Sequence, residues 1–255
     1  MHKLTCMDKK KISAKDKLIL SLDVIDVDKL TRIIRDLKDY VSIFKIGMCL
    51  YTSVGPRIID IIQGEGGTVY FDGKFNDIPN TVARASEALI DKGVNFFSIH
   101  TTGGSKMIKT CVEASKKRAQ ELSMPEPRIL GVTILTSLGQ KTVNEEIGIP
   151  GHVCDYTLRL TRLAKDSGLS GVVISGCEAK EVRKRVNNNF IILTPAIRPT
   201  WAQINDQLRV LTPREAIEAG SDYLVVGRPI TMAKDHISAI KLVVDEIEEA
   251  IEVSL

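Results

Sequence analysis

TVYFDGKFNDIPNT, residues 68–81, joins an apolar run to a charged turn. Its first four residues are β-branched or aromatic, which is typical of a short buried strand. Three charges of alternating sign follow, Asp72, Lys74 and Asp77, and residues 82–92 then have the pattern of a helix. The segment is therefore one strand-to-helix unit with a charged turn. Exposed turns also carry ion pairs of little energetic value, so the spacing alone does not decide whether this turn is a functional site.

The same unit recurs along the whole chain, as short apolar runs that are each followed by a helical pattern. The predicted strands are residues 18–24, 42–47, 68–71, 95–100, 128–135, 171–175, 190–195 and 222–227. The predicted helices are residues 27–39, 54–63, 82–92, 103–122, 154–167, 178–186, 213–219 and 233–253. Continuous apolar strands are buried on both faces, as parallel strands are. Eight such units predict an α/β protein with a single-domain (β/α)8 TIM barrel, and a doubly wound open sheet is the alternative.

Composition limits the class of protein. The 255 residues are 44% apolar, and 35 basic and 32 acidic residues leave a net charge of +3. This near balance, without a basic stripe, argues against a nucleic-acid-binding protein. We divide the chain into a basic N-terminal tail, residues 1–16, which we expect to be flexible, and a barrel domain, residues 17–255.

The cysteines and the apolar runs predict the compartment. The five cysteines are scattered singly, without the spacing of a metal finger or a redox pair, and indicate free thiols in a reducing compartment. No apolar run approaches the length of a membrane span, and the N-terminus lacks the apolar segment of a signal peptide. We therefore expect a soluble cytoplasmic protein with no membrane contact.

In a (β/α)8 barrel the active site lies at the carboxyl ends of the strands. The polar groups that the sequence places there come from most of the strands, and we expect them to converge on one mouth. They are Asp23, Lys45, Asp72, Lys74, Asp77, His100, Thr136, Arg198, Gln207 and Arg228. This convergence favours the functional interpretation of the charged turn.

Lysines and aspartates alternate within this set. Neighbouring acids keep a lysine protonated, and neighbouring lysines keep an aspartate ionised. Lys45, Asp72, Lys74 and Asp77 therefore predict a network of alternating charges. Such a network can deliver a proton to a fixed position and can hold an aspartate against a substrate carboxylate.

The ends of the last two strands predict a phosphate site. In barrels a phosphate commonly binds at the loops after strands seven and eight. Gly227 allows close approach of the backbone, and Arg198 and Arg228 offer forked donors to phosphate oxygens. Gln207, in the long connection 196–212, can donate its side-chain amide to the same phosphate.

The charged turn, Asp72-Gly-Lys-Phe-Asn-Asp-Ile-Pro-Asn-Thr81, resembles the Asp-x-Lys-x-x-Asp-Ile-x-x-Thr signature of the orotidine 5'-phosphate decarboxylase family. Further blocks resemble that family in its order, at residues 44–47, 194–199, 206–207 and 226–230. The resemblance extends from about residue 18 to the end of the chain. It is highly specific because the signature and its flanking blocks occur together.

The resemblance implies decarboxylation of orotidine 5'-monophosphate to uridine 5'-monophosphate in pyrimidine biosynthesis, by a homodimer that needs no metal or cofactor. By this resemblance Lys74 protonates the ring carbon and Asp72 lies beside the substrate carboxylate. Lys45 completes the network and, with Asp23, resembles the pair that contacts the ribose hydroxyls.

The same resemblance assigns the remaining site residues. Asp77 and Thr81 match residues that reach into the neighbouring subunit's site. Thr136 matches the hydroxyl residue beside the pyrimidine. The residues that contact the phosphate and help to close the loop are matched by Arg198, Gln207, Gly227 and Arg228. Phosphate binding is then expected to close the loop 199–206 over the site.

Some positions depart from the commonest pattern of the family. Ala196 stands where glycine is usual, Gly73 where a larger apolar residue is frequent, and Asn76 where histidine is frequent. His100 begins a variant of a His-Ala-x-Gly-Gly block, and we expect it to be structural. None of these departures removes a charge from the predicted network.

Two alternatives have different chemistry. Magnesium-dependent sugar-phosphate decarboxylases and aldolases share the Asp-x-Lys-x-x-Asp block. At the second strand, however, they have a glutamate that binds the metal, where this chain has Lys45. A metal ion beside two lysines would be repelled. A non-catalytic barrel that binds a phosphorylated ligand would be expected to have lost part of the charge network, which is complete in this sequence.

Overall fold

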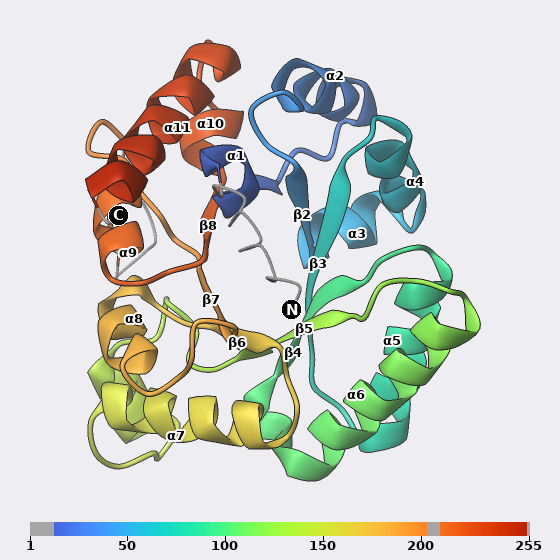
Figure 1. Ribbon diagram of the computed structural model, residues 1–255, viewed down its shortest axis with the longest axis vertical. Helices are drawn as coiled ribbons and strands as arrows, with labels where there is room; N and C mark the ends of the chain where they lie inside the picture. Colours follow the sequence, from blue (N-terminus) through green and yellow to red (C-terminus); the bar gives the residue numbers. More distant parts are fainter. Residues whose placement is uncertain (1–12, 203–209, 254–255) are drawn as a thin grey trace, which may run out of the picture.

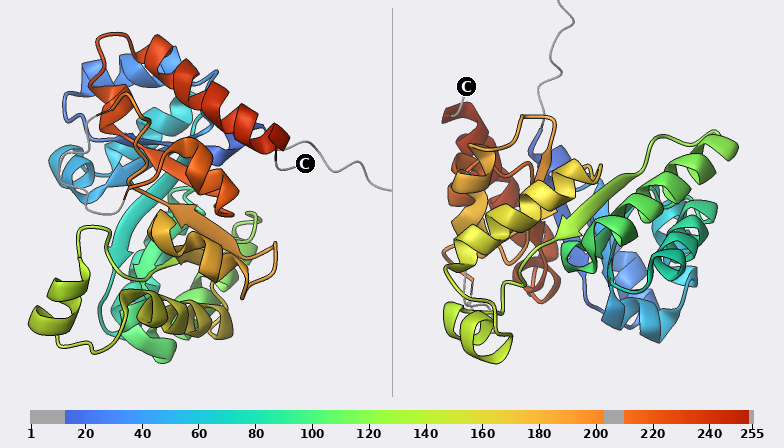
Figure 2. Two further views of the ribbon diagram at one scale, coloured as in Figure 1. Left: turned by 90° about the vertical axis from the view of Figure 1, so that its left-hand side faces the viewer. Right: turned by 90° about the horizontal axis from the view of Figure 1, so that it is seen from below.

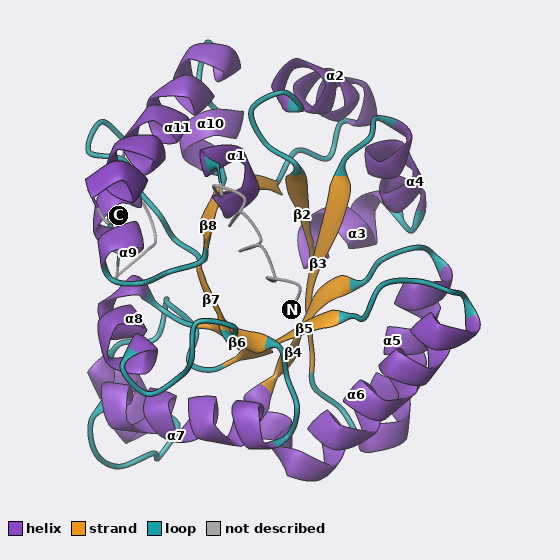
Figure 3. Ribbon diagram, viewed as in Figure 1, coloured by secondary structure: helices purple, strands orange, loops and turns teal. Residues whose placement is uncertain are grey.

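The computed structural model describes residues 13–202 and 210–253. Its strands form one closed barrel in which each strand pairs with its sequence neighbours, and β8 returns to pair with β1 in parallel. The helices surround this barrel (Figure 1, Figure 3). Side views show the strands running through the middle of the molecule with helices packed around them (Figure 2). The predicted (β/α)8 barrel is confirmed, and the open-sheet alternative is wrong.

The strands are β1 Leu18–Leu22, β2 Ile43–Gly47, β3 Thr68–Phe75, β4 Phe96–His100, β5 Arg128–Val132, β6 Gly171–Val173, β7 Ile191–Thr194 and β8 Tyr223–Val226. The α-helices are α1 Ala14–Lys17, α2 Val27–Leu37, α3 Met48–Val54, α4 Arg57–Gly64, α5 Pro79–Asp91, α6 Gly104–Glu121, α7 Val153–Asp166, α8 Gly176–Arg183, α9 Pro213–Glu218, α10 Arg228–Thr231 and α11 His236–Val253. A 3-10 turn, η1 Thr101–Gly103, follows β4, and a π-helical turn, η2 Thr142–Glu146, lies in the long connection after β5.

Side-chain alternation divides each strand between two apolar cores. In β1, Leu18, Leu20 and Leu22 belong to the large core between strands and helices, whereas Ile19 belongs to a smaller core inside the barrel. The inner core is completed by side chains from the other strands: Ile43, Tyr70, Phe96, Leu130, Val132, Val173, Leu193 and Val225. This arrangement is the packed interior expected of a small closed barrel.

The inward positions change from apolar to polar along the first three strands. Two residues after Ile19 comes Ser21, two after Ile43 comes Lys45, and two after Tyr70 comes Asp72. The strands are parallel and in register, so Ser21 pairs with Lys45 and Gly47 with Asp72. The polar positions therefore gather at one end of the barrel.

The structure corrects the sequence prediction around the second and third strands. The helix predicted at 54–63 is α4 and begins only at Arg57, and a helix that was not predicted, α3, precedes it. The two are separated because Gly55 adopts a positive φ of 75° and Pro56 has no N–H to donate. Strand β3 does not end at Phe71 but continues to Phe75, with a register irregularity between these two residues. The charged turn therefore begins within the strand.

The barrel also begins earlier than the expected boundary at residue 16. Helix α1 starts at Ala14, which is fully buried. The Ser13 hydroxyl donates to Asp16 Oδ2 at 2.9 Å and stabilises this turn. Among the described helices none is long and apolar enough to cross a membrane.

Candidate active site

A pocket of about 320 Å³ opens at the carboxyl ends of the strands. It brings together eight of the residues predicted for the site: Asp23, Lys45, Asp72, Lys74, Thr136, Arg198, Gly227 and Arg228. Strands β1 to β3 supply the charged wall. The opposite wall is apolar and comes from β5 to β8 and the residues that follow them, including Val132, Ile134, Val173, Leu193 and Val225.

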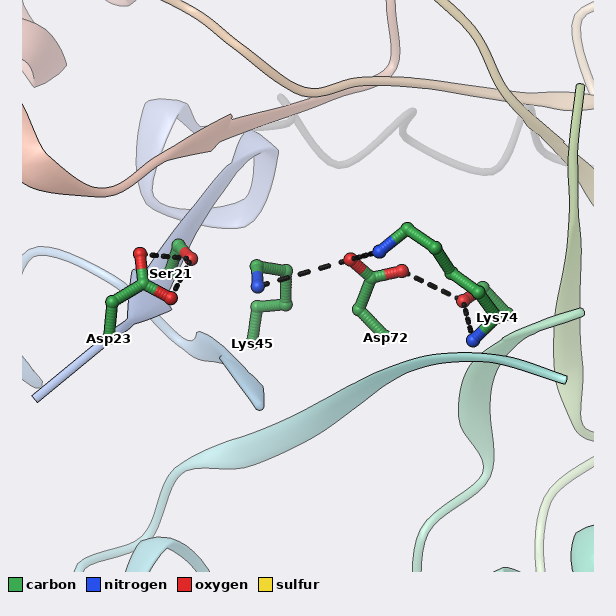
Figure 4. A network of polar contacts seen from close by, with 6 residues as sticks. Ser21, Asp23, Lys45, Asp72 and Lys74 are labelled. Atoms are coloured by element: carbon green, nitrogen blue, oxygen red, sulfur yellow. Dashed lines mark hydrogen bonds and ion pairs between the residues drawn. The ribbon is translucent and has the colours of Figure 1, made fainter. Parts of the chain in front are cut away.

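The charged wall is a row of groups of alternating sign. Lys45 lies between Asp23 and Asp72, and Lys74 lies beyond Asp72 (Figure 4). Lys74 Nζ donates to Asp72 Oδ2 at 2.5 Å, and Lys45 Nζ is 3.9 Å from the same oxygen. The side chains of Lys45 and Asp72 are only 12% and 13% exposed, so these charges are shielded from water and depend on each other.

Ser98 of β4 fixes the orientation of Asp72. Its hydroxyl donates to Asp72 Oδ1 at 2.8 Å and accepts the backbone N–H of Lys74 at 3.2 Å. Burial alone would raise the pKa of Asp72, but Lys74, Lys45 and the hydrogen bonds outweigh it, so the pKa of this carboxyl lies below its usual value. Asp72 is therefore an ionised carboxylate whose two oxygens both have partners.

The Lys74 side chain enters the barrel from an unusual backbone conformation. Lys74 has a φ of 49°, in the left-handed region that residues other than glycine rarely adopt. The irregularity of β3 and the hydrogen bond to Ser98 hold it there. Gly73 has no room for a side chain, because a Cβ would lie 2.3 Å from the Phe71 ring. This packing explains the small residue at a position where the family often has a larger one.

The ribose side of the predicted site lies where β1 meets β8. The Ser21 hydroxyl donates to both carboxylate oxygens of Asp23, at 3.2 and 3.3 Å. A Cβ on Gly227 would lie 3.0 Å from the Ser21 Cβ and 3.3 Å from Asp23 Oδ2. A side chain at position 227 would thus be crowded by the neighbouring strand, a reason for glycine additional to the backbone approach to phosphate that the sequence predicts.

The two predicted phosphate arginines, Arg198 and Arg228, also line the pocket. Arg198 is 7% exposed, and its backbone N–H donates to Leu211 O at 2.9 Å. With the bridge between Ile197 and Leu211, this bond joins the two ends of the long connection after β7. Arg228 is the first residue of α10. Gln207 and part of the loop 199–206 lie outside the described residues.

A comparison with known sequences identifies the family. The sequence profile of the Orotidine 5'-phosphate decarboxylase / HUMPS family matches residues 16–243. The chain belongs to this family.

Individual relatives agree with the family match. The chain is 39% identical over 240 residues to the orotidine 5'-phosphate decarboxylase of Heliobacterium modesticaldum, covering 94% of this chain and 99% of the relative. It is 42% identical to that of Syntrophotalea carbinolica, covering 94% and 98%. Among solved structures, the orotidine 5'-phosphate decarboxylase of Lactobacillus acidophilus superposes with a TM-score of 0.79 at 32% identity, covering 91% of this chain and 98% of that one.

Two residues of the family signature lie apart from the pocket. Asp77 and Thr81 are exposed and do not line it. Asp77 Oδ1 accepts the backbone N–H of Ile78 at 2.6 Å, and Ile78 itself is 67% exposed. In a single chain, therefore, Asp77 does not extend the Lys45–Asp72–Lys74 row.

His100, which the sequence predicts to be structural, does not line the pocket either. Burial and then the Lys74 charge lower the pKa of His100 below its usual value, although Asp72 opposes them. The neutral imidazole is therefore favoured, and it adds no further positive charge beside Lys74.

Sequence reasoning missed Ser98, Ser21 and Tyr70, which support or line the charged wall. The alternation of side chains along β4 could have identified Ser98, because it points Phe96, Ser98 and His100 into the barrel. A small hydroxyl between two larger inward side chains marks a position where a neighbouring polar group needs a partner.

The side chains of this pocket do not favour a bound metal ion. Within the described residues no group of three or more His, Cys, Asp or Glu side chains is placed to hold one. The carboxylate of Asp72 is already engaged by Lys74 and Lys45. A cation at this carboxylate would have to displace or approach two ammonium groups.

Proposed function

We propose that this chain decarboxylates orotidine 5'-monophosphate to uridine 5'-monophosphate in pyrimidine biosynthesis, and that it does so without a metal or cofactor. The observation that carries this proposal is the Lys45–Asp72–Lys74 row in a pocket with two arginines, in a member of the family named for this reaction. The charge row and the two arginines match a nucleotide that carries a reacting carboxylate and, remote from it, a phosphate.

Lys74 supplies the proton in the proposed mechanism. Cleavage of the bond between the ring carbon and the carboxylate releases carbon dioxide and leaves an electron pair on that carbon. The Lys74 ammonium stabilises this developing charge and then donates a proton to the carbon, becoming a neutral amine that regains a proton from water. Asp72 keeps the ammonium charged and directed into the pocket until this step.

Asp72 has a second role in this proposal. Its low pKa keeps it ionised, so a substrate carboxylate placed beside it is repelled, and this repulsion ends when neutral carbon dioxide leaves. Arg198 and Arg228 bind the phosphate together with Gly227 and Gln207. The binding energy of the phosphate offsets the repulsion between the two carboxylates. Asp23 and Lys45 bind the ribose hydroxyls, and Thr136 contacts the pyrimidine.

We further propose a cytoplasmic homodimer with shared sites. The free Cys49, Cys111, Cys154 and Cys177 suit a reducing compartment. Ile25, Met48 and Ile78, which follow β1, β2 and β3, are 57%, 52% and 67% exposed. Such an apolar rim on three neighbouring loops is typical of a contact surface, and Asp77 and Thr81 lie beside it in the chain, where they can reach a second copy's pocket.

The loss of ultraviolet absorbance of orotidine 5'-monophosphate tests the proposed activity. Wild type should turn the substrate over, and Lys74→Ala should reduce kcat by about 10³-fold or more, because it removes the proton donor and the charge that stabilises the carbanion. The variant should still bind uridine 5'-monophosphate. Lys109→Ala, which removes an exposed lysine on α6, is the matched control and should leave turnover unchanged.

Chelation separates this proposal from the magnesium-dependent alternative. Activity should persist after treatment with EDTA. If EDTA abolished turnover and magnesium restored it, the metal-free mechanism would be wrong. A wild type that binds the nucleotide without turning it over would instead support the non-catalytic alternative.

A further inference from the structure

Tyr70 lies at the junction of the apolar core and the charged wall. It is two residues before Asp72 on the inward face of β3 and is 1% exposed. Its ring packs against Phe96, with ring centroids 4.6 Å apart, within the core inside the barrel. The same side chain also lines the pocket, next to Asp72.

The Tyr70 hydroxyl is buried and forms no hydrogen bond of good geometry among the described residues, although Asp72 and Ser98 lie close to it. Burial, followed by the nearby charge of Asp72, raises the pKa of Tyr70 well above its usual value, so the group stays protonated and can donate. A buried donor without an acceptor is unfavourable, and native proteins rarely keep one without a reason. The hydroxyl is therefore suited to an acceptor that enters the pocket.

The neighbouring groups indicate what this acceptor is. Asp72 Oδ2 is engaged by Lys74 and Lys45, and Asp72 Oδ1 accepts from Ser98. An entering oxygen with negative charge would be the strongest acceptor for a neutral hydroxyl at this place. In the proposed reaction the substrate carboxylate is the anionic group that lies beside Asp72.

We propose that the Tyr70 hydroxyl donates a hydrogen bond to the substrate carboxylate and holds it beside Asp72. This inference rests on the proposed function. Tyr70 forms no covalent bond and transfers no proton. As the carboxylate becomes neutral carbon dioxide it turns into a poor acceptor, so the hydrogen bond is strong in the bound substrate and weak once the bond to the ring breaks. Tyr70 thus makes the site prefer the carboxylated nucleotide over its product.

Tyr70→Phe tests this role because it removes one oxygen and keeps the ring. The KM for orotidine 5'-monophosphate should rise about 10-fold or more, while kcat does not fall. The inhibition constant of uridine 5'-monophosphate, which has no carboxylate, should not change. The thermal midpoint should be at least that of wild type, since an unpartnered hydroxyl leaves the interior.

Two further variants sharpen the comparison. In a Lys74→Ala background, which cannot complete the chemistry, calorimetry with both nucleotides measures binding directly, and Tyr70→Phe should reduce only the affinity for orotidine 5'-monophosphate. Tyr223→Phe is the matched control, because the Tyr223 hydroxyl has a protein partner, accepting from Arg128 at 2.9 Å. It should change stability without changing the preference between the two nucleotides.

The outcomes are distinguishable. A folded Tyr70→Phe variant with normal turnover and an unchanged preference, or with equal losses for both nucleotides, would overturn the role of Tyr70 and leave the proposed function intact. Absence of turnover in wild type would reject the proposed function itself.

Discussion

The buried charges of the site stabilise one another only as a set. Asp72 is shared by two ammonium groups and by the hydroxyl of Ser98. Removing one member of such a set leaves the others with uncompensated charge, which typically costs about 3–5 kcal/mol. Lys74 adds a backbone cost, since its left-handed φ of 49° is unfavourable by about 1–2 kcal/mol for a residue with a Cβ. The site is thus a locally unfavourable arrangement that the rest of the barrel supports.

The lowered pKa of Asp72 makes its contribution to stability dependent on pH. An unfolded aspartate binds its proton near pH 3.8, whereas the folded Asp72 binds it only at lower pH. Its stabilisation is therefore complete above about pH 5 and is lost as the pH falls through the folded pKa. Asp72→Asn should lower the free energy of unfolding at pH 7 by about 3 kcal/mol.

Urea unfolding of both proteins between pH 7 and pH 3 checks this prediction. The difference between wild type and Asp72→Asn should be constant down to about pH 5 and should shrink below pH 4 as the wild-type carboxyl becomes neutral. A difference that did not vary with pH would show that the charge of Asp72 is not the cause of its stabilising effect.

A residue with a left-handed backbone lines the pocket near the end of β3, and another does so shortly after β7. In β3 this residue is Lys74, and after β7 it is Ala196, with a φ of 63°. The family usually has glycine at the position of Ala196, and this conformation gives the physical reason. Ala196 lies between the last residues of β7 and the bridge from Ile197 to Leu211, so its conformation sets where Arg198 begins.

Ala196→Gly should therefore stabilise the protein. Glycine removes a steric cost of about 1–2 kcal/mol and adds about 0.5–1 kcal/mol of lost chain entropy, for a net gain of about 0.5–1 kcal/mol in the free energy of unfolding. Ala219→Gly is the matched control, because Ala219 has an ordinary helical φ of −73° and the change there should destabilise. Chemical denaturation measures both, and the prediction is wrong if the two changes have the same sign.

The sequence predicted the elements better than their ends. The positions of Asp23, Lys45 and Asp72 at or near the ends of predicted barrel strands predicted that they would share one mouth, and the pocket contains all three. It did not predict that β3 would continue beyond Phe71, because a strand irregularity depends on pairing with β4. Ser98 was missed for a similar reason, because its partner Asp72 comes from another strand. Tyr70 was missed because its proposed partner is the substrate.

At the scale of the whole molecule the barrel separates charge from apolar surface. The charged residues of the pocket come from β1 to β3, the apolar wall from β5 to β8, and the arginines from the loops after β7 and β8. A sequence pattern can place a residue at a strand end, but it cannot show which chain's pocket the residue serves. Asp77 and Thr81 carry the family signature and yet lie apart from the pocket of their own chain.

Mixing two inactive variants tests whether sites are shared between subunits. If Asp77 serves the partner's pocket, a hybrid of a Lys74→Ala chain and an Asp77→Ala chain holds one site with both residues intact and one site with neither. Random exchange makes about half of the dimers hybrids with one complete site each, so about a quarter of wild-type activity should return. Lys74→Ala mixed with Asp72→Ala is the control and should recover nothing, because both residues line the same chain's pocket. Subunit exchange would be verified by mass spectrometry of tagged chains, and verified exchange without recovery would place Asp77 outside the shared site.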